Sequence, residues 1–126
     1  MNLIVWTDSL SVGIPIIDEQ HKQLISIIND LYAALDTLVL EHSLQKLSDY
    51  VVYHFSTEEN IMRTCDYPDR LIHEDEHKAL TEQVVAFTKD NSIPELLVFL
   101  RDWLNNHILG TDKQLGTFLK NQNITL

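Results

Sequence analysis

Apolar residues recur at intervals of three and four along almost the whole chain, which is the period of an amphipathic α-helix. We therefore expect four helices, from about Asp18 to Leu38, from Ser43 to Thr64, from Asp69 to Thr88 and from Ser92 to about Gly110. The connections between these segments are too short for a crossover, so neighbouring helices must run antiparallel. The pattern predicts an all-α fold, an antiparallel up-down-up-down four-helix bundle that residues 1–126 form as a single domain.

The two ends of the chain fall outside the four segments. Residues 1–17 are expected to form an irregular N-terminal arm, because Gly13 and Pro15 interrupt helical structure. A short C-terminal helix is expected over Lys113–Leu119. Only three glycines and three prolines occur in the chain, which argues against an all-β fold with many turns.

Helix boundaries are marked by residues that start or stop helices. Pro68 prevents continuation of the second helix. Ser92 and Glu95 have the spacing of a capping box for the fourth helix, with Pro94 in its first turn. Gly110 marks either the end of that helix or a distortion in it. The apolar residues expected to face the core are Leu24, Ile28, Leu31, Leu35, Leu38, Leu44, Leu47, Val51, Ile61, Leu80, Val84, Phe87, Leu96, Leu100, Trp103 and Leu104.

Histidines and carboxylates continue these apolar faces at positions where a core should reject them. The set comprises His21, His54, Glu58, His73, His77, His107 and Asp112. In an up-down-up-down bundle, the start of the first and third helices and the end of the second and fourth lie at the same level. Because buried charges must be paired or must bind a metal, the seven side chains together predict a metal site. His42 lies at the opposite end and is expected on the surface.

The ligand set itself indicates which metals can bind. Imidazole mixed with carboxylate suits iron, zinc or manganese. Seven ligands are too many for a single tetrahedral zinc, but they suit two six-coordinate ions. If both carboxylates and one further oxygen bridge the ions, about one of roughly twelve coordination positions stays open for a small ligand.

At these residues the chain resembles the hemerythrin family, in particular the bacterial hemerythrin-like proteins. The matching pieces are Trp6, Val12-Gly13-Ile14, Ile17-Asp18, Gln20-His21-Lys22, His54-Phe55, Glu58-Glu59, His73, His77, Trp103-Leu104, Asn106-His107-Ile108 and Asp112. The resemblance implies a non-heme di-iron site that binds dioxygen reversibly. It also implies that the protein is not an enzyme.

The resemblance also assigns roles to residues. It implies one iron on His73, His77 and His107 and the other on His21 and His54. Both Glu58 and Asp112 would bridge the irons beside an oxo or hydroxo group, with dioxygen at the two-histidine iron. By position, the apolar residues that could form the wall of the dioxygen pocket are Leu24, Phe55, Trp103 and Leu104. Each is also an ordinary core residue.

Charge and composition limit the partners and the location. The net charge of −10 argues against nucleic acid and against anionic membrane surfaces. The first six residues lack the basic start of a signal peptide, and no apolar run reaches the length of a membrane span. The single cysteine, Cys65, rules out an internal disulfide and fits a reducing compartment. We therefore expect a cytoplasmic protein.

The sequence leaves three alternatives open. His73-Glu74-Asp75-Glu76-His77 matches the H-E-x-x-H pattern of zinc metalloproteases, although we expect its acidic residues to form a solvated face. A ferritin-like di-iron oxidase needs a Glu-x-x-His motif on each of two helices, and only Glu74 and His77 provide one. Within the hemerythrin family, the domain could instead be the sensor module of a larger signalling protein. It would then respond to dioxygen, redox state or nitric oxide and act through a fused or interacting output domain.

Overall fold

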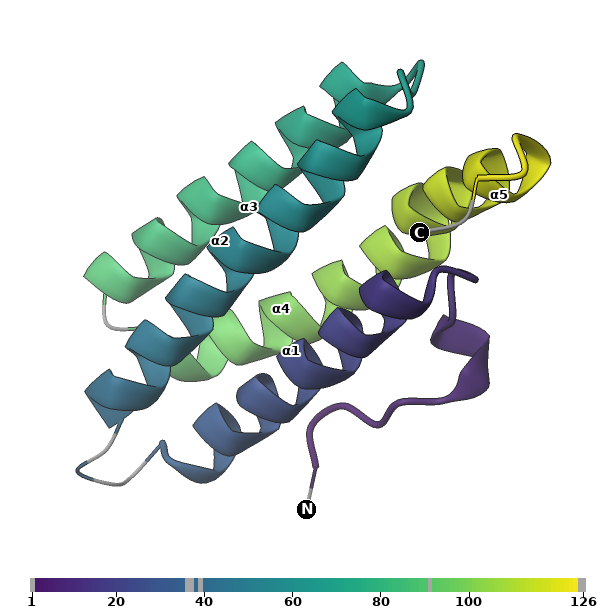
Figure 1. Ribbon diagram of the computed structural model, residues 1–126. Coiled ribbons are helices and arrows are strands. Elements are labelled where there is room, and N and C mark those ends of the chain that lie inside the picture. The colour runs from purple at the N-terminus through teal and green to yellow at the C-terminus, as the bar shows by residue number, and fades with distance from the viewer. Residues whose placement is uncertain (1, 36–37, 39, 91, 125–126) are drawn as a thin grey trace.

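The computed structural model describes residues 2–35, 38, 40–90 and 92–124. Four long helices lie side by side in Figure 1. They are α1 (Pro15–Ala33), α2 (Leu40–Thr64), α3 (Arg70–Lys89) and α4 (Ile93–His107), and a π-helical turn (Ile108–Asp112) joins α4 to α5 (Lys113–Asn121). Both α1 and α3 pack against α2 and against α4, as in an up-down-up-down bundle. The predicted fold class and the short C-terminal helix are confirmed.

The core of the bundle is built from the apolar faces of the four helices. Ile28 and Leu31 of α1, Leu47 of α2 and Leu96 of α4 are at most 1% exposed. Burial of such aliphatic side chains contributes about 1.5–3 kcal/mol each, so the packing of the four helices supplies stability that each amphipathic helix would lack in isolation. None of the helices in the described ranges combines the length and the apolar character that a membrane crossing requires.

The N-terminal arm runs beside α1 (Figure 1) and is tied to it by hydrogen bonds. The Asn29 side chain accepts from the backbone N–H of Ile4 and donates to its carbonyl oxygen. The arm is shorter than predicted, because α1 begins at Pro15 and not at Asp18. Proline fixes a helical φ and lacks an N–H that the first turn cannot satisfy, so Pro15 starts the helix.

One predicted helix end and one predicted capping box are wrong. The first helix stops at Ala33, and Leu38, which we expected in the core, is fully exposed in the connection to α2. Part of that connection, residues 36–37 and 39, lies outside the described residues. Ser92 does precede α4, but its side chain makes no capping bond, so the capping box is not formed. Pro94 in the first turn is confirmed.

Candidate metal centre

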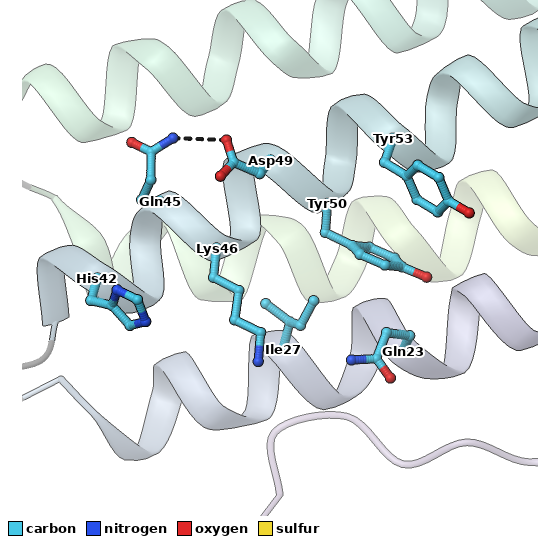
Figure 2. Close-up of a pocket in the computed structure, with 8 residues that line it drawn as sticks. All are labelled: Gln23, Ile27, His42, Gln45, Lys46, Asp49, Tyr50 and Tyr53. Carbon is cyan, nitrogen blue, oxygen red and sulfur yellow. Dashed lines mark hydrogen bonds between the residues drawn. The ribbon is translucent and has the colours of Figure 1, made fainter.

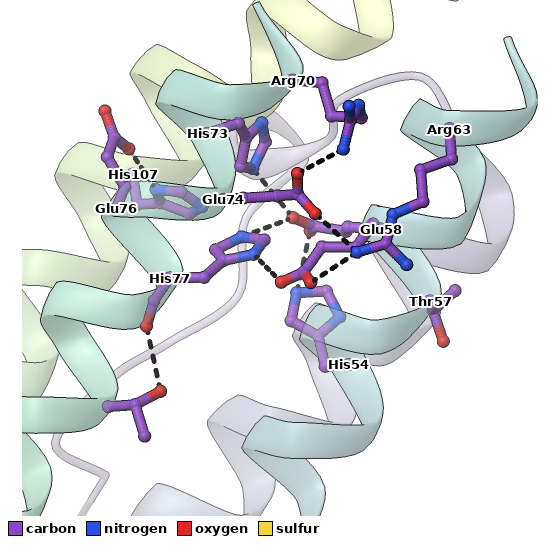
Figure 3. Close-up of polar contacts among 12 residues, drawn as sticks. His54, Thr57, Glu58, Arg63, Arg70, His73, Glu74, Glu76, His77 and His107 are labelled. Atoms are coloured by element: carbon purple, nitrogen blue, oxygen red, sulfur yellow. Dashed lines mark hydrogen bonds and ion pairs between the residues drawn. The ribbon is translucent and has the colours of Figure 1, made fainter. Parts of the chain in front are cut away.

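All seven side chains predicted as ligands meet inside the bundle, and each residue is at most 4% exposed. Their ligand atoms form two groups that share both carboxylates. One group is His73, His77 and His107 with Glu58 and Asp112, and the other is His21 and His54 with the same two carboxylates. Figure 3 shows how side chains from α2, α3 and α4 point toward one another at this centre.

Glu58 faces both histidine groups, with one carboxylate oxygen toward each. Its Oε2 lies 2.9 Å from Nε2 of His54 and 3.5 Å from Nε2 of His21. Its Oε1 lies 3.0 Å from Nε2 of His73 and 3.1 Å from Nε2 of His77. His54 and Glu58 are spaced i, i+4 on α2, so both project from the same face of that helix.

Asp112 has the same relation to the two groups from the other side of the centre. Its Oδ2 lies 3.0 Å from Nε2 of His21, and its Oδ1 lies 3.0 Å from Nε2 of both His73 and His107. Asp112 follows His107 by five residues. In a regular α-helix, a residue at this spacing would face away from the centre. The π-helical turn Ile108–Asp112 removes this mismatch, because its repeat places residues i and i+5 on the same face. The distortion predicted near Gly110 is therefore the feature that positions a ligand.

The distances among these atoms fit metal ions placed between them. Two ligand atoms at right angles around one ion, with bonds of about 2.1 Å, lie about 3.0 Å apart. The nitrogen–oxygen distances of 2.9–3.1 Å within the two groups match this value. Although these atoms lie close together, several of them make no hydrogen bond of acceptable geometry within the described residues, including Nε2 of His21 and of His107 and both carboxylate oxygens of Asp112. Since buried polar atoms must be satisfied, a bound cation accounts for the arrangement.

Without a metal, the centre attracts protons. Burial alone would lower the pKa of His21 and of His73, but the Asp112 and Glu58 carboxylates outweigh it and raise each pKa to about 9. The same carboxylates raise the pKa of His107. Burial would raise the pKa of Glu58, but the surrounding histidines hold it well below its usual value. Histidines likewise lower the pKa of Asp112. Metal ions and protons therefore compete for the same atoms.

A second layer of side chains, not predicted from the sequence, binds the outer nitrogens of three histidines. Nδ1 of His54 lies 2.8 Å from Oε1 of Gln20. Nδ1 of His77 lies 3.0 Å from Oε2 of Glu59. These bonds place the ring proton on Nδ1 and leave Nε2 free to face the centre. The only signal in the sequence is adjacency, since Gln20 and Glu59 each stand next to a ligand.

Glu76 is the third member of this layer. Its contacts differ from the prediction that Glu74, Asp75 and Glu76 form a solvated acidic face. Its Oε2 lies 2.9 Å from Nδ1 of His107 and accepts a 2.7 Å hydrogen bond from the Thr111 hydroxyl. Glu74 is also engaged, in ion pairs of 2.8 Å with Arg63 and Arg70. Asp75 is exposed and the Glu76 side chain is 41% exposed, so the predicted acidic face is solvated only in part. Glu74 lies outside both ligand groups, so neither the protease motif nor the Glu-x-x-His motif describes this centre.

The four predicted pocket residues lie in or beside the core. Leu24, Phe55 and Leu104 are buried, and Trp103 is partly exposed. The Phe55 ring stacks on the imidazole of His77 at 3.8 Å, and the Trp103 ring stacks on that of His107 at 4.3 Å. Both aromatic rings thus stack on the three-histidine group, whereas the resemblance places dioxygen at the two-histidine group. Their role as pocket walls stays a prediction.

His42 lies away from the centre, as expected. It is exposed in the first turn of α2 and lines a surface groove with residues of α1 and α2, among them Ile27, Lys46 and Tyr50 (Figure 2). It belongs to neither ligand group.

Comparison with known proteins agrees with this geometry. Residues 12–119 match the family model of the hemerythrin HHE cation-binding domain. Bacteriohemerythrin from Stenotrophomonas maltophilia is 31% identical over 95% of this chain and 84% of its own length. Bacteriohemerythrin from Clostridium acetobutylicum is 29% identical over 89% of this chain and 98% of its own length. The crystal structure of a wild-type hemerythrin superposes with a TM-score of 0.83 at 31% identity, covering 91% of this chain and 96% of that one. The chain therefore belongs to the hemerythrin family.

Proposed function

We propose that this protein binds dioxygen reversibly at a non-heme di-iron centre, for oxygen carriage or storage or for oxygen or redox sensing. The proposal is of a binding protein and not of an enzyme. The observation that carries it is the bridging arrangement of Glu58 and Asp112, each with one oxygen toward each histidine group. Membership of the hemerythrin family supports iron as the metal and dioxygen as the ligand.

The residues divide between the two ions according to the groups described above. His73, His77 and His107 would hold one iron, and His21 and His54 the other, with both carboxylates shared. Two ferrous ions held by these residues would supply the two electrons for binding dioxygen and would regain them on its release. The group of His21 and His54 offers one histidine fewer than the other group, so an ion held there would have room for a small ligand.

The protein surroundings serve to keep water and protons from the bound gas. Leu24, Phe55 and Leu104 are at most 6% exposed, and Trp103 covers the imidazole of His107. Exclusion of water favours release of dioxygen unchanged over its loss in a reduced form. We assign the apolar wall of the centre to these four residues on that basis, with the Phe55 and Trp103 rings on the side of the three-histidine group.

Sensing is the second candidate within the same chemistry. A sensor module would use dioxygen, redox state or nitric oxide to change a contact with an output domain. Carriage requires that dioxygen return unchanged on a useful timescale, whereas sensing of redox state requires only that oxidation persist. The two functions therefore predict different fates for the reduced protein in air.

The first test is metal content. The purified protein, expressed in iron-rich medium, should contain about two irons per chain, as the two ligand groups require. Elemental analysis of the protein against its amino-acid content measures this ratio. One metal per chain, or zinc alone, would contradict a di-iron centre.

The second test is dioxygen uptake. The fully reduced protein, mixed with dioxygen in a stopped-flow instrument, should take up one O2 per pair of irons and develop a visible absorption band. Removal of dioxygen should abolish the band and regenerate the reduced protein if the function is carriage or storage. Direct oxidation without such a band would refute reversible binding and would favour sensing. Azide should occupy the same position in the oxidised protein.

A further inference from the structure

The three hydrogen bonds to the outer nitrogens of the histidines are chemically unequal. His77 and His107 are each backed by a carboxylate, from Glu59 and Glu76 respectively. His54 is backed by the neutral amide of Gln20. Within the described part of the chain, Nδ1 of His21 and of His73 has no hydrogen-bond partner. The two carboxylate-backed rings both belong to the three-histidine group.

The identity of the acceptor changes the imidazole as a ligand. With Nε2 toward the metal, Nδ1 carries the proton and donates it outward. A carboxylate draws that proton more strongly than an amide, which makes the ring a better electron donor to the metal. The orientation of Gln20 is fixed, because its amide nitrogen donates to the Thr57 hydroxyl and leaves only its oxygen for His54.

Each acceptor also connects one helix of the bundle to the next. Gln20 of α1 backs His54 of α2, Glu59 of α2 backs His77 of α3, and Glu76 of α3 backs His107 of α4. Glu76 additionally accepts from Thr111, which lies in the π-helical turn that carries Asp112. The acceptors therefore orient the histidines and fix the turn that positions a bridging ligand.

We infer that Glu59 and Glu76 are positioning residues that make the two metal positions unequal, with the ion in the three-histidine group held more tightly. This inference rests on the two-metal centre of the proposed function. The number of histidines in each group is one source of the difference in metal affinity. The inference assigns a further part of that difference to the charge of two residues that are not themselves ligands. The ion on His21 and His54 is then the first to leave and the first to exchange.

The test is the release of zinc from the zinc-loaded protein into an excess of a chromogenic chelator. Two zincs per chain should leave the wild type in two phases of equal amplitude. Glu59→Gln and Glu76→Gln keep a hydrogen-bond acceptor and remove its charge, so each should accelerate the slow phase by roughly 10–100-fold, the usual effect of losing such a partner. The fast phase should not change. Gln20→Glu should slow the fast phase, because it gives His54 a carboxylate.

Glu74→Gln is the matched control. Glu74 lies on α3, as Glu76 does, but it pairs with two arginines instead of a histidine. Its slow phase should equal that of the wild type. Slow phases of Glu59→Gln and Glu76→Gln within twofold of the wild type would overturn the inference, as would an equal acceleration in Glu74→Gln. Rescue of the slow phase by Glu76→Asp would support a role for charge over shape. A wild type that binds fewer than two zincs per chain would instead refute the two-metal centre of the proposed function.

Discussion

Raising the pH from about 6 to about 9.5 should weaken the metal-free protein while leaving the iron-loaded protein at least as stable. In the metal-free state, the pKa of His21 and of His73 is about 9, against 6.5 for an ordinary histidine. A raised histidine pKa stabilises the folded state fully below pH 6.5, and this contribution is lost as the pH rises through 9. With metal bound, the same rings must be neutral, so a higher pH favours the bound state.

The magnitude follows from the pKa values. One pKa unit corresponds to about 1.4 kcal/mol, so the rise from 6.5 to about 9 corresponds to about 3 kcal/mol for each histidine. The pair contributes less than twice that amount, because His21 and His73 share the carboxylates of Asp112 and Glu58. A loss of about 3–5 kcal/mol is a large fraction of the stability of a small domain. The metal-free protein should therefore come close to unfolding at high pH.

The assay is urea denaturation of the metal-free and iron-loaded proteins at several pH values, followed by far-ultraviolet circular dichroism. The two curves of unfolding free energy against pH should diverge above pH 6.5. Titration of groups outside the centre acts on both forms and largely cancels in the difference. His42→Gln, which alters an exposed histidine outside the centre, should reproduce the wild-type curves. If the unfolding free energy of the metal-free protein does not change from about pH 6.5 to 9.5, the histidines of the centre do not bind protons more tightly in the folded state, and the reasoning is refuted.

Three further substitutions, two of them with a matched control, test the site and the fold. Glu58→Ala removes a ligand that faces both groups and should reduce iron to less than one per chain, whereas His42→Ala should keep about two in the same elemental analysis. Leu104→Trp should slow dioxygen uptake in stopped-flow mixing without loss of iron, at an overpacking cost of about 1–3 kcal/mol. Gly116→Ala would place its Cβ against the Val12 carbonyl oxygen and should lower the thermal midpoint by about 4–12 °C. Gly110→Ala meets no neighbouring atom and should not lower the midpoint in the same thermal melt, because alanine favours a helix.

The helices could be predicted from sequence because apolar period and burial are local properties of each segment. Leu24, Leu47 and Leu100 face the core as their spacing requires. The errors fall at helix ends, where tertiary contacts decide. Nothing near Leu38 in the sequence shows that α1 stops five residues earlier, and Pro15 can either break or begin a helix. Which of these happens depends on how the N-terminal arm packs.

The ligand set could be predicted because a charged residue on an apolar face is costly unless it has a partner. His54 and Glu58, like His73 and His77, are four residues apart and lie on one helix face by regular geometry. Asp112 is different, because five residues from His107 is the wrong spacing for an α-helix. Only the π-helical turn brings it to the centre. Gly110 signalled a distortion there, but its kind and its consequence needed the structure.

The acceptors behind the histidines could not be predicted, and bundle geometry explains why. A helix neighbour of a ligand is rotated by about 100° from it, so it cannot face the same centre. It can instead reach the adjacent helix, and the three acceptors do so in order around the bundle, from α1 to α2, α2 to α3 and α3 to α4. In the sequence, Glu59 and Glu76 therefore read as ordinary surface acids beside Glu58 and His77. Their role depends on which helix lies next to which, and this information lies in the packing of the helices and not in any single segment. Two chains with identical metal ligands can therefore differ in charge at these two positions. Such a difference can tune the metal centre without a change in any ligand.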